Sequence, residues 1–235
     1  DRTVIIIPTY NEAQNIAPII ARVREFAPGV RILVVDDNSP DGTADIVRGL
    51  MQVHPNIALL SRAGKEGLGK AYLNAFDEVL KDPSVEWVQM LDADFSHDPK
   101  YFSAIAEAAK RADVIIGSRY VHGGGTVGWV LWRRVLSRMA NTYCRLITGM
   151  PVHDTTAGYI RMRASTMRAA HLEHIQAKGH AFMMEVKYRL WKSGARVVEI
   201  PVLLEDRFQG KSKISRRVLG EAALAPWKMR LRKNV

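Results

Sequence analysis

The sequence has almost no cysteine: Cys144 is the only one among 235 residues, so no disulfide can form within the chain. No cysteine and histidine spacing indicates a zinc site. No stretch reaches the roughly 18 apolar residues that cross a bilayer, and the first residues lack the layout of a signal peptide. We therefore expect any membrane contact to be peripheral or through a partner. With 47% hydrophobic and 25% charged residues, the chain is expected to form one globular domain with a full core.

Charge is divided unevenly along the chain. Residues 1–118 carry 12 basic and 17 acidic side chains, whereas residues 119–235 carry 22 basic and 7 acidic ones, so the net charge changes from −5 to +15. A basic half beside an acidic half indicates that a polyanion binds on one side. Phosphate groups, phospholipid headgroups and nucleic acid are the candidate ligands, and a solvated basic face is the alternative.

Short β-branched runs alternate with amphipathic stretches in the first half, which predicts a parallel sheet flanked by helices. The predicted strands are residues 4–8, 31–36, 57–61, 86–92 and 113–118. The predicted helices are residues 12–25, 42–54, 67–81 and 99–110. Ligands of such doubly wound α/β layers bind at the carboxyl ends of the strands. Motifs at those ends are therefore the best candidates for function.

The pattern becomes less regular after Gly117. A glycine-rich segment, residues 122–128, leads into a predicted helix over 129–148, and a helix or a pair of strands is expected within 151–205. Residues 214–232 mix Leu, Ala, Trp and Met with Arg and Lys, which predicts an amphipathic helix at a membrane interface. A surface helix packed on its own domain is the alternative.

Two carboxylates, Asp92 and Asp94, come directly after a predicted buried strand. Residues two apart in an extended segment point to the same side, so the two side chains converge. Such a pair requires a cation or a proton, and oxygen ligands suit Mg²⁺ or Mn²⁺. A divalent ion there would stabilise a leaving diphosphate, whereas a solvated turn is the alternative.

Two more predicted strands end in polar motifs. Asp36 and Asp37 follow the second strand and are candidates for binding the base or ribose of a nucleotide. Asp41 or Thr43 is an alternative cap of the helix that follows. Tyr10, after the first strand, offers a stacking surface. Three strand ends therefore combine candidate nucleotide-binding and metal-binding groups.

Four motifs occur in order at these strand ends: Pro-Thr-Tyr-Asn-Glu at 8–12, Val-Asp-Asp-Asn-Ser-Pro-Asp-Gly-Thr at 35–43, Leu-Asp-Ala-Asp at 91–94 and Gly-Ser-Arg-Tyr at 117–120. Less common segments follow within 128–141, 178–185 and 206–213. Together they resemble family 2 glycosyltransferases, and within that family the dolichol-phosphate mannosyltransferase group, called polyprenol-monophosphomannose synthases in bacteria. The similarity extends over nearly the whole chain.

The resemblance implies a GT-A fold, in which a Rossmann-like, mostly parallel sheet is flanked by helices and amphipathic interface helices lie toward the C-terminus. It implies one domain over residues 1–235, with a nucleotide-sugar-binding half (1–118) and an acceptor and membrane-interface half (119–235). The implied reaction is inverting transfer of mannose from GDP-mannose to a polyprenyl phosphate, with Mg²⁺ or Mn²⁺. The implied location is the cytoplasmic face of a membrane, as a peripheral protein on an anionic surface. A transmembrane protein or domain is a candidate partner, and no nucleic acid is expected.

The resemblance also assigns site residues, position by position. The guanosine is expected to contact Pro8, Tyr10, Glu12, Val35 and Asp37. The sugar-diphosphate and metal are expected at Asp92, Ala93 and Asp94, with Ser96 reaching the metal directly or through water. Arg207 and Lys213 are expected to close over the nucleotide phosphates, and Arg119, Arg133 and Ser137 to bind the lipid phosphate. Asp92, Asp94 and Arg119 are the expected catalytic residues. Arg161 departs from the family pattern, because Ile160 separates it from Tyr159.

Two other classes of function stay open at this point. A glycosyltransferase that uses UDP-glucose or another hexose donor with the same lipid would need the same metal-binding and phosphate-binding residues. A basic module that binds anionic membranes or nucleic acid without catalysis would show steep salt dependence. That module would leave the acidic strand ends unexplained.

Overall fold

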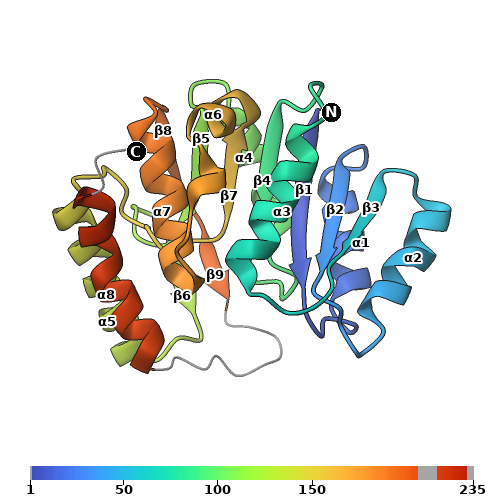
Figure 1. The fold of residues 1–235 in the computed structure, drawn as a ribbon, viewed down its shortest axis with the longest axis horizontal. Coiled ribbons are helices and arrows are strands. Elements are labelled where there is room, and N and C mark those ends of the chain that lie inside the picture. Colours follow the sequence, from blue (N-terminus) through green and yellow to red (C-terminus); the bar gives the residue numbers. More distant parts are fainter. Residues whose placement is uncertain (1, 206–215, 232–235) are drawn as a thin grey trace.

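A seven-stranded sheet forms the centre of the molecule (Figure 1). The computed structural model describes residues 2–205 and 216–231. The strands are β1 (Thr3–Thr9), β2 (Arg31–Asp36), β3 (Ile57–Ser61), β4 (Trp87–Met90), β5 (Val114–Ser118), β7 (Ile160–Arg163) and β8 (Val197–Pro201), in the order β3-β2-β1-β4-β7-β5-β8. Neighbouring strands are parallel except at β7, which is antiparallel to β4 and β5. The predicted α/β class with a mostly parallel sheet is confirmed.

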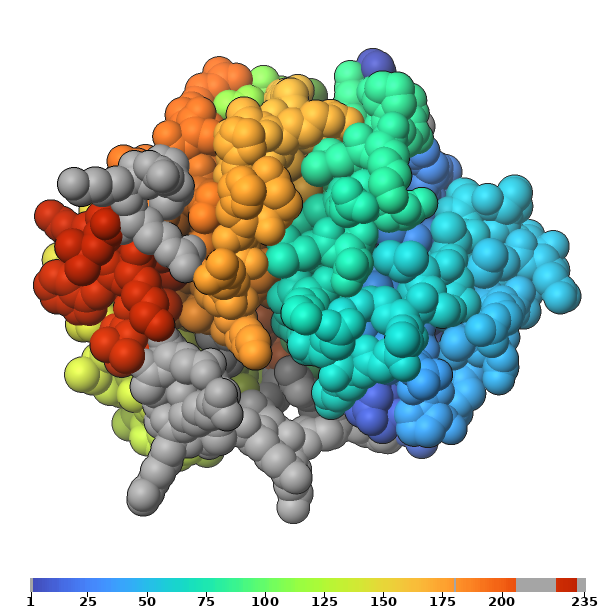
Figure 2. All heavy atoms as spheres, in the orientation of Figure 1, coloured from blue at the N-terminus to red at the C-terminus, as the bar shows by residue number. Residues whose placement is uncertain are grey.

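Helices cover both faces of this sheet, and side chains of each strand alternate between them as the strand period requires. In β1, Ile6 packs into one core, and Ile5 and Ile7 pack into the other. Helices α3 (Leu68–Leu80) and α7 (Gly179–Lys192) cover the near face in Figure 1, where Figure 2 shows them packed together. The other face is covered by α1 (Ile16–Phe26), α2 (Thr43–Val53), the short turn η1 (Pro99–Tyr101) and α4 (Phe102–Ala108).

The segment 151–205 departs from the prediction of one helix or a pair of strands. It forms β7, α6 (Ala164–Ala169), the turn η2 (Leu172–His174), α7, β8 and β9 (Leu203–Glu205). The sequence of β7 alternates Ile and Met with Arg161 and Arg163, whose guanidinium carbons lie 5.1 and 4.4 Å from the centre of the Trp87 ring. Cation–π contacts thus allow charged residues in a strand that lies inside the sheet.

Arg161 belongs to this strand and not to the ligand-binding edge. Its Nη2 donates to the Thr3 hydroxyl at 2.8 Å, and only 9% of the residue is exposed. Burial lowers the pKa of Arg161 to about 10, because desolvation disfavours the charged form. The departure of Arg161 from the family pattern therefore coincides with a structural position inside the sheet.

Two long helices lie side by side at one edge of the molecule, α5 (Leu131–Thr148) and α8 (Arg216–Leu231) (Figure 1). The Tyr143 hydroxyl donates to the Ala223 carbonyl at 2.9 Å and accepts from Trp227 Nε1 at 3.0 Å. Gly149 ends α5 with φ of 72°, a conformation that favours glycine. The helix predicted at 129–148 is confirmed with a slightly later start, and the described part of the stretch predicted to be helical at 214–232 is a helix over Arg216–Leu231. A second small sheet pairs β6 (Gly125–Val127) with β9.

Candidate active site

The carboxyl ends of β2, β1 and β4 meet at one edge of the sheet, because these strands are parallel neighbours. A cavity of about 290 Å³, called the donor cavity below, opens there. Its lining residues are Pro8, Thr9, Tyr10, Glu12, Asp37, Lys65, Gly67, Leu68, Ala71, Asp92, Ala93 and Asp94. The structure thus brings together most residues that the sequence assigned to the nucleotide sugar. Val35 is fully buried in the core.

The two acids at the end of β2 have different environments. Asp36 is 1% exposed, and its carboxylate accepts hydrogen bonds from the Thr9 hydroxyl at 2.9 Å and from the Ser39 N–H and hydroxyl. Asp37 lines the donor cavity and forms an ion pair with Arg62. The interpretation of both acids as nucleotide ligands is wrong for Asp36, which ties the ends of β1 and β2 together.

The loop after β2 is hydrogen-bonded to the loop after β1. The Asp41 carboxylate accepts from the Ala13 N–H at 3.0 Å, and the Thr43 hydroxyl accepts from the Glu12 N–H at 3.0 Å. The N-cap of α2 is Gly42, which has no side chain to cap the helix. Asp41 and Thr43 therefore fix the backbone of the segment that carries Glu12.

The segment between β3 and α3 also lines the donor cavity, although no motif was identified in this segment. Lys65, Gly67 and Leu68 belong to the lining, and Lys65 Nζ lies 3.9 Å from the centre of the Tyr10 ring. Only the position of this segment in the sequence could have predicted its role in the lining, since it follows a parallel strand whose carboxyl end lies at the same edge of the sheet.

The two carboxylates after β4 both face the donor cavity. The Asp92 side chain is 30% exposed, while Asp94 is 7% exposed. The Ser96 hydroxyl donates to Asp94 Oδ1 at 2.6 Å, and the Ser96 N–H donates to the same atom at 3.1 Å. Ser96 therefore orients Asp94, and its role as a metal ligand stays a prediction.

Two buried residues that the sequence interpretation missed support Asp92. The Tyr72 hydroxyl donates to Asp92 Oδ1 at 3.5 Å. Burial, with the charge of Asp92 second, holds the pKa of Tyr72 well above its usual range, so this phenol remains a donor. The His97 ring nitrogen Nδ1 accepts from the Asp92 N–H at 3.1 Å, which leaves the ring proton on Nε2 in the neutral form. Tyr72 and His97 thus fix the side chain and the backbone of Asp92.

Two groups of side chains are able to hold a metal ion. Asp92 and Asp94 offer oxygen ligands, which Mg²⁺ and Mn²⁺ prefer. His171, Glu173 and His174 are exposed and offer two ring nitrogens and one carboxylate, a set that suits zinc. That second group follows α6, at the opposite edge of the sheet from the donor cavity. Of these two groups of described residues, only the carboxylate pair lines the donor cavity.

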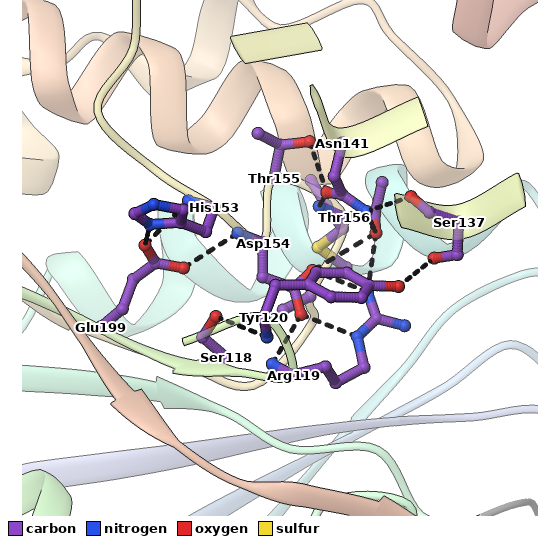
Figure 3. Close-up of polar contacts among 12 residues, drawn as sticks. Ser118, Arg119, Tyr120, Ser137, Asn141, His153, Asp154, Thr155, Thr156 and Glu199 are labelled. Atoms are coloured by element: carbon purple, nitrogen blue, oxygen red, sulfur yellow. Dashed lines mark hydrogen bonds and ion pairs between the residues drawn. The ribbon is translucent and has the colours of Figure 1, made fainter. Parts of the chain in front are cut away.

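A buried ion pair follows β5 (Figure 3). Arg119 donates from Nε and Nη2 to the two carboxylate oxygens of Asp154 at 2.7 and 2.6 Å, and from Nη2 to the Thr156 hydroxyl at 2.8 Å. Burial favours the neutral form of each partner, but the mutual attraction outweighs it, so the pKa of Arg119 is raised and that of Asp154 is lowered. Both groups are therefore charged. The sequence did not predict Asp154 as the partner of Arg119.

A second cavity of about 190 Å³, called the basic cavity below, lies beside Arg119. Arg134 and Arg138 line it together with Arg119. The guanidinium carbon of Arg133 instead lies 3.8 Å from the centre of the Trp129 ring. The Ser137 hydroxyl accepts a hydrogen bond from the Tyr120 hydroxyl at 2.6 Å. The assignment of Arg133 and Ser137 to the lipid phosphate stays a prediction. Arg207 and Lys213 lie outside the described residues.

Apolar side chains are exposed along α5 and α8. The residues are Leu131, Trp132, Val135, Leu136, Met139, Leu146, Leu224, Trp227 and Leu231. Arg134 and Arg138 on α5 and Lys228 on α8 add positive charge to these helices. Within residues 2–205 and 216–231, no helix is both long enough and apolar enough to cross a bilayer.

Comparison with known proteins gives consistent matches. A family model described as Glycosyl transferase family 2 matches residues 4–168. A polyprenol monophosphomannose synthase from Mycolicibacterium smegmatis is 42% identical over 233 residues, which cover 97% of this chain and 88% of that protein. An undecaprenyl-phosphate mannosyltransferase from Micrococcus luteus is 40% identical over 223 residues, which cover 95% of this chain and 91% of that protein. Both relatives therefore align with nearly the whole chain.

Two solved structures share the fold at lower identity. A mannosyltransferase from Pyrobaculum calidifontis in complex with GDP-Man and Mn²⁺ has a TM-score of 0.59 and 16% identity, and the match covers 97% of this chain and 72% of that one. A glucosyl-3-phosphoglycerate synthase from Mycobacterium tuberculosis in complex with Mn²⁺, uridine diphosphate and phosphoglyceric acid has a TM-score of 0.64 and 14% identity, with coverage of 97% and 78%. At such identities the likeness concerns the fold, and it agrees with the GT-A architecture.

Proposed function

Because the chain belongs to glycosyl transferase family 2, we propose that it transfers mannose from GDP-mannose to the phosphate of a polyprenol. The observation that carries this proposal is the donor cavity, where Asp92 and Asp94 face the same space as Tyr10 and Asp37. A nucleotide and a metal-bound diphosphate require those two sets of groups side by side. The identity of 40% and 42% to two mannosyltransferases supports mannose as the sugar and a polyprenyl phosphate as the acceptor.

In this proposal the donor cavity holds GDP-mannose. Pro8, Tyr10, Glu12 and Asp37 would contact the guanosine. Val35 is also assigned to the guanosine, but its side chain is fully buried in the core, so this contact would be made by its backbone. The pairing with Arg62 fixes the orientation of Asp37. Arg207 and Lys213 are proposed to contact the nucleotide phosphates.

Asp92 and Asp94 would hold a Mg²⁺ or Mn²⁺ ion, aided by Ser96, because both carboxylates face one cavity. When bound, such an ion stabilises the negative charge that develops on the leaving GDP. Ala93 lines the same cavity and would contact the sugar-diphosphate.

The acceptor is proposed to bind in and around the basic cavity. Arg119 is held in one position by Asp154, which also neutralises its charge, so the net positive charge of the cavity comes from Arg134 and Arg138. Arg133 and Ser137 lie on the same helix, one position before each of these arginines. We propose that these groups align the lipid phosphate with the sugar.

The reaction needs no general base, because a phosphate monoester is already anionic near neutral pH. An oxygen of the lipid phosphate attacks the anomeric carbon of mannose, and the bond to the GDP oxygen breaks with its electron pair. Attack from the side opposite the leaving group inverts the anomeric centre. An α-linked donor therefore yields a β-linked mannosyl phosphate lipid.

We also propose that α5 and α8 rest on an anionic membrane surface, as parts of a single domain formed by residues 1–235. Exposed Leu131, Trp132 and Trp227 would enter the headgroup boundary, and the nearby arginines would pair with lipid phosphates. The proposed location is the cytoplasmic face, as a peripheral protein with or without a transmembrane partner. This arrangement lets the acceptor phosphate reach the basic cavity while its tail stays in lipid.

Replacing Leu131 and Trp132 together by serine is expected to weaken binding to phosphatidylglycerol vesicles about 100-fold. These side chains are 72% and 64% exposed, and each apolar side chain contributes roughly 1.5 kcal/mol when it enters lipid. Vesicle flotation measures the partition. The matched control replaces Met51 and Val53 of α2, which are also exposed, and is expected to bind like the wild type. Equal binding of both variants would argue against this surface.

Transfer of radiolabelled sugar to a short polyprenyl phosphate in detergent tests the proposed function. We expect lipid labelling from GDP-mannose that requires Mg²⁺ or Mn²⁺. Labelling from UDP-glucose alone would keep the mechanism and change the donor. Absence of labelling from either donor, in the presence of membranes as well as detergent, would contradict the proposal.

A further inference from the structure

The loop of residues 154–159 lies between the two parts of the proposed catalytic site. It leads into β7, which is antiparallel and inserted between β4 and β5. The amino end of β7 is therefore at the same edge of the sheet as the carboxyl ends of its neighbours, after which Asp92 and Arg119 follow. Sheet topology alone thus places this loop between the acceptor side and the donor side.

On the acceptor side, the loop supplies the partners of Arg119. Asp154 accepts three hydrogen bonds from Arg119, two from the guanidinium and one from the backbone N–H at 3.0 Å, and Thr156 accepts a further guanidinium bond. Asn141 of α5 accepts from the Thr155 hydroxyl at 2.8 Å and from the Thr156 N–H at 3.2 Å (Figure 3). The position of Arg119 is therefore set by the conformation of this loop.

On the donor side, the same loop supports Asp92 through His97. The rings of Tyr159 and His97 are stacked with centres 4.9 Å apart and planes 10° apart. A Cβ atom at Gly158 would lie 3.0 Å from His97 Cε1, so the backbone approaches this ring closely. His97 in turn accepts from the Asp92 N–H. A shift of the loop would therefore move the backbone that carries the metal-binding carboxylate.

Lys187 of α7 is hydrogen-bonded to the backbone of this loop. It is 1% exposed, and its ammonium group donates to the carbonyl oxygens of Thr155 at 3.0 Å, Ala157 at 2.5 Å and Met183 at 3.4 Å. The first two acceptors belong to the loop. Neither the donor cavity nor the basic cavity has Lys187 in its lining. Lys187 therefore contacts the loop but lines neither cavity.

Holding a charged amine at this position opposes folding. Burial is the largest influence and lowers the pKa of Lys187 to about 8, with Arg119 adding repulsion, while Asp154, Cys144 and Glu199 act in the opposite direction. An apolar residue of similar length would fill the same space without desolvating a charge. The three carbonyl contacts are what the lysine adds, and two of them fix the loop between the substrates.

We propose that Lys187 is a positioning residue for both parts of the active site. By binding the carbonyl oxygens of Thr155 and Ala157, it keeps the 154–159 loop in the conformation that places Arg119 for the acceptor and Asp92 for the metal and donor. This inference rests on the proposed glycosyl transfer. It adds that one buried ammonium group couples the geometry of the two sites.

Lys187→Met tests this role, with Lys192→Met of the same helix, exposed in the structure, as the matched control. For Lys187→Met we expect kcat to fall about 30-fold or more, KM for polyprenyl phosphate to rise at least 5-fold, and half-maximal activation to need several-fold more Mn²⁺. The melting temperature is expected to stay within a few degrees of the wild type, because a buried charge is removed. Lys192→Met is expected to match the wild type in all four measurements.

Thr156→Val tests the acceptor side alone, because the hydroxyl that it removes contacts Arg119, Asn141 and Asp154 and no residue of the donor side. This variant should raise KM for the lipid and leave the Mn²⁺ dependence unchanged, whereas Lys187→Met should alter both. Lys187→Met with wild-type kinetics, or with a lowered melting temperature and unchanged KM and Mn²⁺ dependence, would overturn the proposal. Lys187→Gln serves the same comparison if Lys187→Met does not fold.

Hydrogen exchange of the amides in residues 154–159 gives a readout that does not depend on catalysis. Faster exchange of this loop in Lys187→Met than in Lys192→Met is expected, and equal exchange would overturn the positioning role. An inactive wild-type protein would contradict the proposed transfer reaction and would leave this exchange comparison intact. The two ideas therefore fail in distinguishable ways.

Discussion

Replacing Asp94 by asparagine is expected to lower kcat for mannosyl transfer about 1000-fold, which corresponds to about 4 kcal/mol of transition-state stabilisation. Asp94 lines the donor cavity, is 7% exposed, and directs its carboxylate by two hydrogen bonds from Ser96. Asparagine keeps the Oδ1 acceptor of both bonds and removes the charge that a divalent ion requires. Activity should therefore disappear without a change of fold.

Initial rates of lipid labelling at saturating Mn²⁺ measure this effect, and thermal unfolding checks that the fold is kept. Ser96→Ala is the matched control, since it removes the hydroxyl donor and leaves the Asp94 carboxylate in place. We expect that control to lose no more than about tenfold in kcat, equivalent to about 1.4 kcal/mol for one hydrogen bond. Wild-type activity of Asp94→Asn would exclude a metal-binding role for this carboxylate.

Replacing Asp154 by alanine is expected to lower the free energy of unfolding by about 3–5 kcal/mol, because it leaves the Arg119 guanidinium buried without its counter-charge. Arg119 is 9% exposed and Asp154 is fully buried, so water does not replace the lost partner. The backbone N–H of Arg119 loses its acceptor as well. Urea denaturation followed by circular dichroism measures the change.

The exposed pair of Lys110 and Glu107 provides the control for this prediction. Their side chains are 73% and 71% exposed, and Glu107→Ala is expected to change the free energy of unfolding by less than about 1 kcal/mol. A double variant, Asp154→Leu with Arg119→Met, should recover most of the loss, because it removes both buried charges. An Asp154→Ala protein as stable as the wild type would show that the buried guanidinium of Arg119 does not need a counter-charge.

The loss in Asp154→Ala should also depend on pH. The pKa of the Asp154 carboxyl is lowered in the folded state, so its contribution to stability is complete above the unfolded-state value of about 3.9 and is lost as the pH falls through the folded-state value. The stabilities of the wild type and the variant should therefore converge in acid. The same denaturation experiment at a series of pH values measures this convergence.

The sequence by itself determined the fold class, and it predicted which residues line the proposed donor side of the site. Strand and helix periods are local, and parallel neighbours bring their carboxyl ends to one edge, so Tyr10, Asp37, Asp92 and Asp94 could be assigned together before any contact was known. Asp92 and Asp94 are separated by one residue after a strand, which made their convergence a consequence of backbone geometry alone.

Tertiary structure decided which polar groups support the site and which face it. Asp36 and Asp37 are adjacent in sequence, yet one bonds to Thr9 and the other pairs with Arg62. On α5, apolar residues recur at helical spacing, but the structure leaves Leu131, Val135 and Met139 exposed. The apolar stripe therefore did not predict that Arg134 and Arg138 line the basic cavity.

The insertion of β7 and the contacts of its preceding loop were likewise set by packing. Asp154 lies 35 residues from Arg119 in sequence, and Lys187 lies 30 residues from Ala157. The physical reason is range: backbone preferences and side-chain periods act over a few residues, whereas the partner of a buried charge depends on which distant segments the folded core brings together.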